Sequence, residues 1–449
     1  MTQQQAINVT GNNIANVNTP GYSRQRVLLA NNVVQNSTLG VIGSGVTSLG
    51  IERVYDRFVG VQINSESENL GRWEAQKQTL EGVEAVFNES SGYGLSQAMS
   101  EFWNAWQDLS NNPSGDTERT ILVSKGESMV RSFRQKYENL RAVQEGIDAN
   151  IQGAVDEVNR LVSQLADLNQ KIIETESGGH TANAYRDQRD LALRELSGLI
   201  DINTFEDANG AIKISISGGQ TLVEGNRPRS LQVQDNVVSG LLDVYYEGLD
   251  GTTADITGSI AGGKLKGWIE ARDTHVANYI ARLDSLSQRI MEEVNDLHSA
   301  GWALDGSTLN DFFSGSDITD MQINVDIVND TRLIAAATDP ASIPGDDSNA
   351  IAIANLKHKL TMGTGPDITF DDFYHSLINE VGSEVVELGA YYNHQSDMVA
   401  YLDNYRESVS GVSLDEEMVN LVKFQSAYDA SAKLISTTDE LIQTVLNMI

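Results

Sequence analysis

The feature that most constrains the fold is a pair of apolar rows that repeat every seven residues between Asp116 and Ser177. The first row holds Phe133, Leu140, Ile147, Ala154, Leu161 and Leu168. The second holds Val130, Tyr137, Gln144, Ile151, Val158, Leu165 and Ile172. Two such rows, with charged residues elsewhere, are typical of a long amphipathic helix packed in a bundle. At 1.5 Å per residue we expect this helix to be roughly 90 Å long.

Proline supports the same interpretation because it is scarce, with 6 residues in 449. The prolines leave 114–227, 229–339 and 367–449 uninterrupted, and proline breaks helix interiors. Apolar residues at helical spacing predict further helices over about 181–200, 267–300, 347–362 and 370–409. The expected fold class is mainly α: a long-helix bundle rod formed from both ends of the chain, with a small inserted β domain.

The hydrophobic period changes in the middle of the chain. Residues 201–262 alternate in short apolar bursts such as Ile212-Lys213-Ile214-Ser215-Ile216, separated by glycine and asparagine turns, which is typical of strands. We therefore expect five segments. They are an N-terminal segment (1–60, a helix and then an extended loop), the first half of a helical bundle (61–200), an inserted small β domain (201–266), the second half of the bundle (267–409, with a mixed loop region at 302–346) and a C-terminal helix (410–449).

Charge and composition exclude several classes of protein. Asp+Glu number 63 against Lys+Arg 31, so the formal net charge is −32. Nucleic acid requires a cationic face and anionic lipid attracts basic segments, so we expect neither as a partner. No apolar run approaches the roughly 20 residues that cross a bilayer, and residues 1–20 lack the pattern of a secretory signal. Cysteine is absent, which excludes disulfides and thiol catalysis.

Patterns that carry chemistry are weak in this sequence. The six histidines are scattered, with no HExxH pair, and Gly262-Gly263-Lys264 lacks the spacing of a phosphate loop. The acidic turn at 305–311 lacks the bidentate glutamate of a calcium loop. We interpret Glu292-Glu293 and Glu416-Glu417 as solvated helix faces, because acidic residues are abundant throughout. The sequence therefore predicts no enzyme, no cofactor and no bound metal.

The two chain ends carry more specific patterns. Near the N-terminus Asn12-Asn13-Ile14-Ala15-Asn16 is followed by Thr19-Pro20-Gly21-Tyr22. Near the C-terminus the chain reads Ser413-Leu414-Asp415-Glu416-Glu417-Met418 and then Phe424-Gln425-Ser426-Ala427-Tyr428. Both patterns resemble the terminal signatures of the flagellar axial proteins of the rod, hook and hook-associated family. Internal segments such as Asp187-Gln188-Arg189-Asp190 are similar to the hook-associated members of that family.

The C-terminal segment also has an apolar row of its own, with Leu414, Leu421, Tyr428, Ile435, Ile442 and Ile449 each seven apart. The companion row is partly polar and holds Met418, Gln425, Ala432, Asp439 and Leu446. Such a helix needs a partner, which is either the other terminus or another copy of the chain. The expected assembly interface comprises Asn12, Asn13, Asn16, Pro20, Gly21, Tyr22, Leu414, Met418, Leu421, Tyr428, Ile435, Ile442, Leu446 and Ile449.

The resemblance implies a structural protein, an adaptor ring that joins the flagellar hook to the filament and is required for filament assembly. It implies four partners: further copies of the chain, the hook protein, hook-associated protein 3, and an export chaperone for the C-terminal helix. It also implies an extracellular location at the hook–filament junction, after export by the flagellar secretion apparatus. Family members have a longer N-terminal helix, so residue 1 is expected to lie inside that helix.

Two alternatives stay open on the sequence alone. Another axial protein of the hook or rod type shares the terminal signatures but usually has a β-rich middle, which the long helices predicted over 116–177 and 267–300 oppose. A secreted enzyme with a helical stalk would need convergent polar groups, and the sequence shows none.

Overall fold

The computed structural model describes residues 2–31, 35–37, 40–42, 45–89, 94–363 and 365–448. Contacts between residues divide the chain into two compact units. Unit 1 comprises Met1–Arg72, Gln152–Lys266 and Tyr392–Ile449, and unit 2 comprises Trp73–Ile151 and Gly267–Tyr391. Each unit is thus built from segments that lie far apart in the sequence, and unit 1 contains both chain ends.

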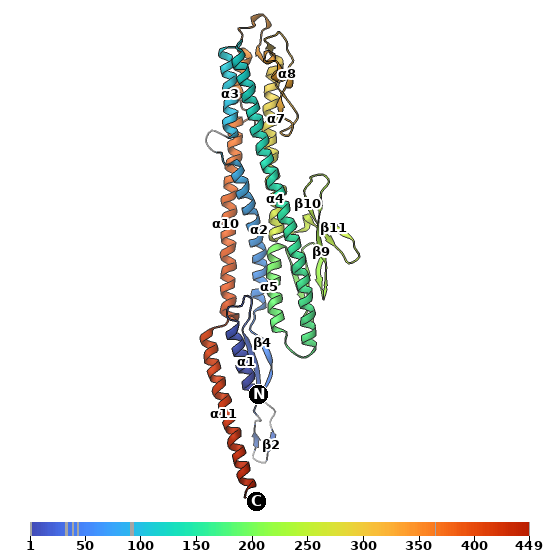
Figure 1. Cartoon of the computed structure of the whole chain (residues 1–449), viewed down its shortest axis with the longest axis vertical. Coiled ribbons are helices and arrows are strands. Elements are labelled where there is room, and N and C mark those ends of the chain that lie inside the picture. Colours follow the sequence, from blue (N-terminus) through green and yellow to red (C-terminus); the bar gives the residue numbers. More distant parts are fainter. Residues whose placement is uncertain are drawn as a thin grey trace. The chain divides into compact units, whose positions relative to one another are not determined.

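Long helices dominate the chain (Figure 1). The α-helices are α1 Thr2–Ala15, α2 Arg57–Phe87, α3 Leu95–Asn111, α4 Asp116–Ser177, α5 Asn183–Leu199, α6 Gly263–Glu270, α7 Ala277–Ala300, α8 Val325–Asn329, α9 Ser348–Ala354, α10 Phe370–Ser410 and α11 Leu414–Leu446. A π-helical segment, Ala271–Val276, joins α6 to α7. The helix α4 has the bounds that its apolar rows predict, and the mainly helical fold class is confirmed.

The strands are short and every pairing between them is antiparallel. Near the N-terminus lie β1 Gln25–Asn31, β2 Gln35–Ser37, β3 Gly40–Ile42 and β4 Val46–Arg53. A four-stranded sheet in the order β5-β6-β7-β8 holds Asn203–Glu206, Ile212–Ser215, Thr221–Glu224 and Arg227–Pro228. A three-stranded sheet in the order β11-β10-β9 holds Thr253–Asp255, Leu242–Glu247 and Ser230–Asp235. In unit 2 lie β12 Trp302–Ala303, β13 Phe313–Ser314, β14 Gln322–Ile323 and β15 Ala335–Ala337.

Two segments differ from the sequence-based expectation. Part of the extended loop expected within residues 1–60 forms an antiparallel pair, in which Val27 of β1 lies opposite Ile51 of β4. The helix predicted over 347–362 is shorter, because α9 ends at Ala354 and a 3-10 turn, Asn355–His358, follows it. Met362 then bridges to Ile368, so the chain has already left the helical conformation there. The division into five segments remains a prediction.

Aromatic side chains form much of the core of unit 2. The ring centroids of Phe102, Trp106 and Phe312 lie within 6.4 Å of one another, and those of Trp106 and Phe312 lie 6.1 and 5.5 Å from the imidazole of His298. Nδ1 of His298 lies 2.6 Å from the carbonyl oxygen of Asn310, and Nε2 accepts the amide hydrogen of Ala335 at 3.0 Å. Burial lowers the pKa of His298 to about 4. This histidine therefore stays neutral and joins two backbone segments.

The polar Gln144 in the second apolar row of α4 has a structural cause. Its Nε2 donates to the carbonyl oxygen of Arg272 at 3.1 Å, within the π-helical segment. A π-helical turn frees backbone groups from the regular ladder, so a buried amide is needed to satisfy one of them. The Arg272 guanidinium, itself buried, pairs with Asp148 one turn further along α4 at 2.5 Å.

The strands of unit 1 are attached to α4 by two asparagines. Asn159 donates to the carbonyl oxygen of Leu231 and accepts its amide hydrogen, both at 2.8 Å. Asn169 does the same for Ile212, at 2.8 and 2.9 Å, and also donates to Gly225 at 2.9 Å. A side-chain amide offers a donor and an acceptor, so it pairs with a strand as another strand would. The helix therefore binds the edge strand β9 of one sheet and, in the other, the start of β6 together with the turn that follows β7.

Asn169→Ala is expected to lower the free energy of unfolding by about 3 kcal/mol, because two buried backbone groups of Ile212 and the half-buried carbonyl of Gly225 would lose their partner. Urea denaturation followed by circular dichroism measures this change. Asn150→Ala, at an exposed position of the same helix, is the matched control and should change stability by less than about 0.5 kcal/mol. Equal effects of the two substitutions would contradict the attachment.

Close backbone approach explains the glycines that resemble a phosphate loop. Gly263 has φ +75°, and a Cβ there would lie 2.3 Å from the carbonyl carbon of Leu199. At Gly71 of α2 a Cβ would lie 2.1 Å from the carbonyl oxygen of Gly198. The glycines therefore let α2, the end of α5 and the start of α6 pack closely. Packing is a sufficient reason for glycine at these positions, without a role in phosphate binding.

A carboxylate pair lies beside this junction. Asp201, which is buried, accepts the amide hydrogens of Ser217 at 2.6 Å and Ala261 at 2.9 Å. Burial, followed by the charge of Asp201, raises the pKa of Glu68 on α2 to about 7. The native chain therefore holds this proton at a higher pH than the unfolded chain does. As the pH rises towards 7 and above, ionised Glu68 opposes folding.

Glu68→Gln is accordingly expected to stabilise the chain at pH 8 and to lose most of that advantage at pH 5, where native Glu68 is protonated. The free energy of unfolding in urea at the two pH values tests this. Glu84→Gln, at an exposed site on the same helix, should show no such pH dependence. If Glu68→Gln destabilises the chain at pH 8, the carboxylate is needed in its ionised form.

Candidate assembly interface

The helices of the two chain ends, α1 and α11, pack against each other in unit 1 (Figure 1). The apolar side chains of α1 that become buried include Ala6 and Val9. The C-terminal row predicted from the sequence thus has a partner within the chain. That partner is short, since α1 has 14 residues and α11 has 33.

A buried asparagine joins four parts of this terminal pair. The Nδ2 of Asn13 donates to the carbonyl oxygen of Gln25 at 2.9 Å and to Oε2 of Glu417 at 3.0 Å. Its Oδ1 accepts the Tyr22 hydroxyl at 2.8 Å and the Gln25 amide at 3.0 Å. Asn13 therefore uses all of its hydrogen-bonding capacity to hold α1, the turn after it, β1 and α11 together.

The turn between α1 and β1 depends on proline and glycine. The amide of Tyr22 donates to the carbonyl oxygen of Thr19 at 3.2 Å, with Pro20 and Gly21 between them. Gly21 has φ +78°, as the third residue of a type II turn requires, and proline suits the second position. A Cβ on Gly21 would also lie 3.3 Å from Cβ of Leu191 on α5. The Pro-Gly-Tyr pattern is thus needed to aim Tyr22 at Asn13.

The other two asparagines of the signature act before the turn. Asn16 donates from Nδ2 to the carbonyl oxygen of Asn12 at 2.9 Å and to its Oδ1 at 2.8 Å. The hydroxyl of Thr19 donates to Oδ1 of Asn16 at 3.1 Å. These bonds end α1 and start the turn. Asn12 and Asn16 therefore shape the backbone, whereas Asn13 connects it to α11.

Charged groups strengthen the same connection. Arg24 pairs with Glu416 at 2.6 Å, and its amide donates to the carbonyl oxygen of Ser410 at 2.8 Å. The amide of Ser23 donates at 3.1 Å to Asp187 on α5, a carboxylate that Arg53 also binds at 3.0 Å. The N-terminal segment is thereby tied to α5 as well as to the start of α11.

Burial, with the charges of Asp187 and Glu417, raises the pKa of Tyr22 to about 12. Its hydroxyl therefore remains a donor at any physiological pH. Ser413 provides the helix cap of α11, where its side chain accepts the amide hydrogen of Glu416. The start of α11 is thus defined by a cap, an ion pair and a buried amide.

The interpretation of two acidic pairs as solvated faces is wrong in part. Glu417 is 3% exposed and binds Asn13, and Glu416 pairs with Arg24. Glu293 is also buried and binds both Arg289 and Lys359. Carboxylates next to each other on a helix point in different directions, so abundance alone does not decide their environment.

The predicted interface residues fall into two groups. Asn13 is buried and the signature around it lies in the connection between the chain ends. The row residues of α11 point mostly outward: Leu414, Met418, Tyr428, Ile435, Ile442 and Leu446 are exposed and Leu421 is half-buried. Ile449 lies outside the described residues. Sequence reasoning missed Arg24, Glu416 and Glu417, for which the family-like Asp-Glu-Glu pattern was the available signal.

The described part of the chain shows no group of three or more His, Asp or Glu side chains suited to a metal ion. Among the same residues, no helix has both the length and the apolar character that a bilayer crossing requires.

Comparisons with known proteins agree with this arrangement. Residues 80–313 match the family described as "Flagellar hook-associated protein FlgK helical domain". Residues 406–448 match "Flagellar basal body rod FlgEFG protein C-terminal", and residues 1–22 match "Flagella basal body rod protein". These terminal matches coincide with α11 and with the segment from α1 to Tyr22.

Full-length relatives agree as well. Flagellar hook-associated protein 1 of Bacillus subtilis is 30% identical, over 99% of this chain and 95% of that protein. The Escherichia coli protein of the same name is 24% identical, over 99% and 97%. The structure of the flagellar hook junction protein FlgK from Burkholderia pseudomallei superposes with a TM-score of 0.71 at 15% identity, covering 78% of this chain and 100% of that one.

The terminal helices and their signatures define the class: this is an axial protein of the bacterial flagellum. Within that class, the long helical middle and the full-length relatives decide the branch. The chain belongs to the flagellar hook-associated protein 1 family, a family of structural proteins of the flagellum. A hook or rod protein, the alternative left open by the sequence, does not explain the match over residues 80–313.

Asn13→Ala is expected to lower the free energy of unfolding of the terminal pair by about 3 kcal/mol, because buried Glu417 and Gln25 would lose their partner. Hydrogen exchange of the Gln25 amide measures this locally and should become at least about tenfold faster. Asn12→Ala, which removes only a bond within α1 and its turn, is the control. Unchanged exchange at Gln25 would show that Asn13 is dispensable.

Proposed function

We propose that this chain forms the adaptor ring at the hook–filament junction, made of several copies of itself. The single observation that carries the proposal is the apolar surface of α11 that the chain itself leaves uncovered. Along the distal half of α11 the apolar side chains are exposed in the described part of the chain. Exposed apolar surface of this kind favours contact with a further helix, which we propose another copy provides.

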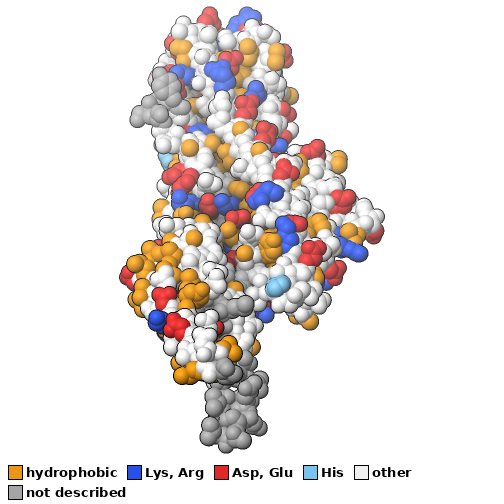
Figure 2. Space-filling model, turned by 60° about the horizontal axis from the view of Figure 1, so that its bottom comes forward, with side chains coloured by type: hydrophobic (Ala, Val, Ile, Leu, Met, Phe, Trp, Pro, Cys, Tyr) orange, Lys and Arg blue, Asp and Glu red, His pale blue; other side chains and the backbone are white. Residues whose placement is uncertain are grey.

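The distal half of α11 exposes two apolar rows. Ile435 is 69% exposed and Ile442 53%, in the row that the sequence predicts. A second row, at helical spacing, consists of Leu434, Leu441 and Val445, all of them exposed, and the exposed Met448 follows just after the helix. Figure 2 shows hydrophobic side chains gathered over this end of unit 1.

The two rows together are wider than one partner requires. At 100° per residue the apolar sector of α11 from Leu441 to Leu446 covers roughly 140°, whereas a helix that packs on one side needs about 100°. Contiguous exposed apolar surface of this kind marks a protein interaction site. We infer that α11 contacts at least two neighbouring helices in the assembly, as a ring of identical subunits would provide.

The family resemblance supplies the other partners of the proposal: the hook protein on one side, hook-associated protein 3 on the filament side, and an export chaperone that covers α11 beforehand. We propose that the assembled protein lies outside the cell after export by the flagellar apparatus, as the resemblance implies. We propose no catalytic activity, since the polar clusters described above bind backbone groups and one another. The proposed interface comprises the α11 residues that the sequence predicts, together with the second apolar row of α11 described above.

Ile435→Lys tests the function. It is expected to prevent incorporation at the hook tip, because a lysine in a contact between subunits would be buried without a partner at a cost of several kcal/mol. In the free chain the same side chain meets water, so the thermal midpoint should stay within about 1 °C. Cells that carry the variant should release unpolymerised filament subunits into the medium.

Ser436→Lys is the matched control, since it adds the same charge one residue away on the polar side of α11 and should leave filaments intact. Labelling of the protein on whole cells locates both variants. If Ile435→Lys cells carry normal filaments, or if the variant melts far below the parent chain, the proposed role of this surface is wrong.

A further inference from the structure

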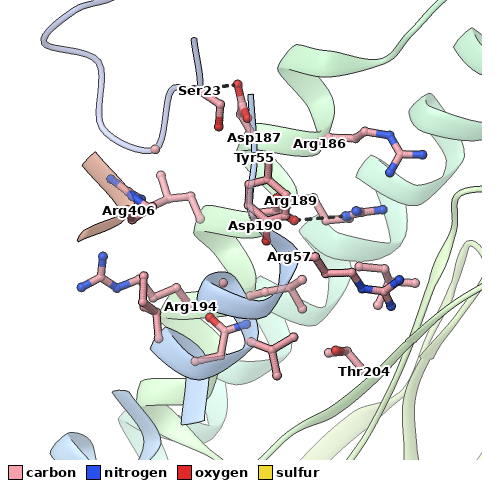
Figure 3. A pocket seen from close by; sticks show the side chains of 18 of the residues that line it. Ser23, Tyr55, Arg57, Arg186, Asp187, Arg189, Asp190, Arg194, Thr204 and Arg406 are labelled. Carbon is pink, nitrogen blue, oxygen red and sulfur yellow. Dashed lines mark hydrogen bonds and ion pairs between the residues drawn. The ribbon is translucent and has the colours of Figure 1, made fainter. Parts of the chain in front are cut away.

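Unit 1 contains a cavity of about 210 Å³ beside the terminal connection. Segments from α2, α5 and the end of α10 line it, together with the turn at Gly21. Figure 3 shows arginine side chains from these helices around it. The lining holds Arg53, Arg57, Arg186, Arg189, Arg194 and Arg406 but only three carboxylates, those of Asp187, Asp190 and Glu206. In a chain with twice as many acidic as basic residues, this excess of cations is local and unusual.

Three of the arginines are paired with carboxylates within the chain. Arg53 binds Asp187 at 3.0 Å and Asp190 at 2.6 Å. Arg186 binds Glu176 and Glu206, and Arg194 forms a two-pronged pair with Asp403 at 2.7 and 2.6 Å. Arg53 and Arg186 thus bind all three carboxylates of the lining. Two of these carboxylates, Asp190 and Glu206, also lie 3.7 Å from Arg189.

The other three arginines keep unused capacity. The side chain of Arg189 is 2% exposed, yet its Nε has no hydrogen-bond partner and its nearest carboxylates lie 3.7 Å away. Burial lowers the pKa of Arg189 despite those carboxylates. Arg57, on the first turn of α2, has no ion pair among the described residues, and Arg406 lies 3.6 Å from the exposed Glu407. A buried donor without an acceptor is costly, and an anion in the cavity would remove that cost.

We propose that this cavity binds a carboxylate side chain from a second copy of the chain. The guanidinium groups of Arg57 and Arg406 would meet the carboxylate at the mouth, and the free Nε of Arg189 would attract it from inside. Arginine recognises carboxylates well because its donors form a planar fork. The exposed Phe58 and Val61 next to Arg57 offer apolar contact around the same opening.

The distal half of α11 offers matching chemistry. Asp429, Asp439 and Glu440 are exposed there, and the last two directly precede the exposed Leu441. Within one chain this half of α11 points away from α5 (Figure 1), so the acidic groups of another copy are the available ones. The inference rests on the proposed assembly and specifies a pair of contacting surfaces within it.

Binding to the purified full chain tests the proposal. A fluorescent peptide of residues 427–446 should bind, and the same peptide with Asp429→Asn, Asp439→Asn and Glu440→Gln should bind at least tenfold more weakly. The double variant Arg57→Gln/Arg406→Gln should bind the acidic peptide at least tenfold more weakly. Arg227→Gln, at an exposed arginine of β8, should bind it as the parent chain does. Both substituted arginines lie at the rim, so buried Arg189 and the fold are kept.

Equal binding of the acidic and neutral peptides, or equal binding to the two arginine variants, would overturn the proposal. Calorimetry with malonate forms a separate arm: malonate binding that depends on Arg57 and Arg406, without peptide binding, would assign the cavity to a small free dicarboxylate and reject the second copy. These measurements use no cells, so their failure is distinct from failure of the junction role, which the Ile435→Lys filaments test.

Discussion

The buried amide of Asn13 is the interaction on which the arrangement of the chain ends depends. It contacts α1, the turn at Tyr22, β1 and α11 at once, and no smaller or charged side chain offers two donors and two acceptors in the same volume. Because Glu417 is buried beside it, the start of α11 has a fixed position relative to α1. A fixed start gives the outward rows of α11 a defined direction, which a self-assembling subunit needs.

Much of the helical architecture could be predicted because its cause is local. The rows of α4 repeat over roughly twelve turns without proline, so the existence of this helix follows from spacing. The pairing of β1 with β4 could not be predicted, since it depends on backbone partners about twenty residues apart whose side chains are only partly buried. The role of Gln144 could likewise not be predicted, because the carbonyl oxygen that it binds, that of Arg272, belongs to a π-helical segment far away in the sequence.

The candidate interface shows the same limit. The terminal signatures identify which residues matter, but not what each one does: Asn12, Asn13 and Asn16 are the same residue type and have three different sets of partners. Burial separates Glu417 from the exposed acids of α11, and no charge pattern in one sequence reports burial. The arginines around the cavity are spread over more than 350 positions, so only the folded chain brings them together.

The base of the β segment has a consequence for how such chains change over evolutionary time. The segment leaves the helices at Asp201 and returns at Ala261, and these two residues share a hydrogen bond of 2.9 Å. An insertion whose ends already touch adds little strain when it is lengthened or shortened, because closing a longer loop costs only slowly more entropy. The alignments with relatives run over 484 to 541 positions against 449 residues here, so length does vary between them. A closed base of this kind lets the β segment change in length while the helices next to it keep their packing.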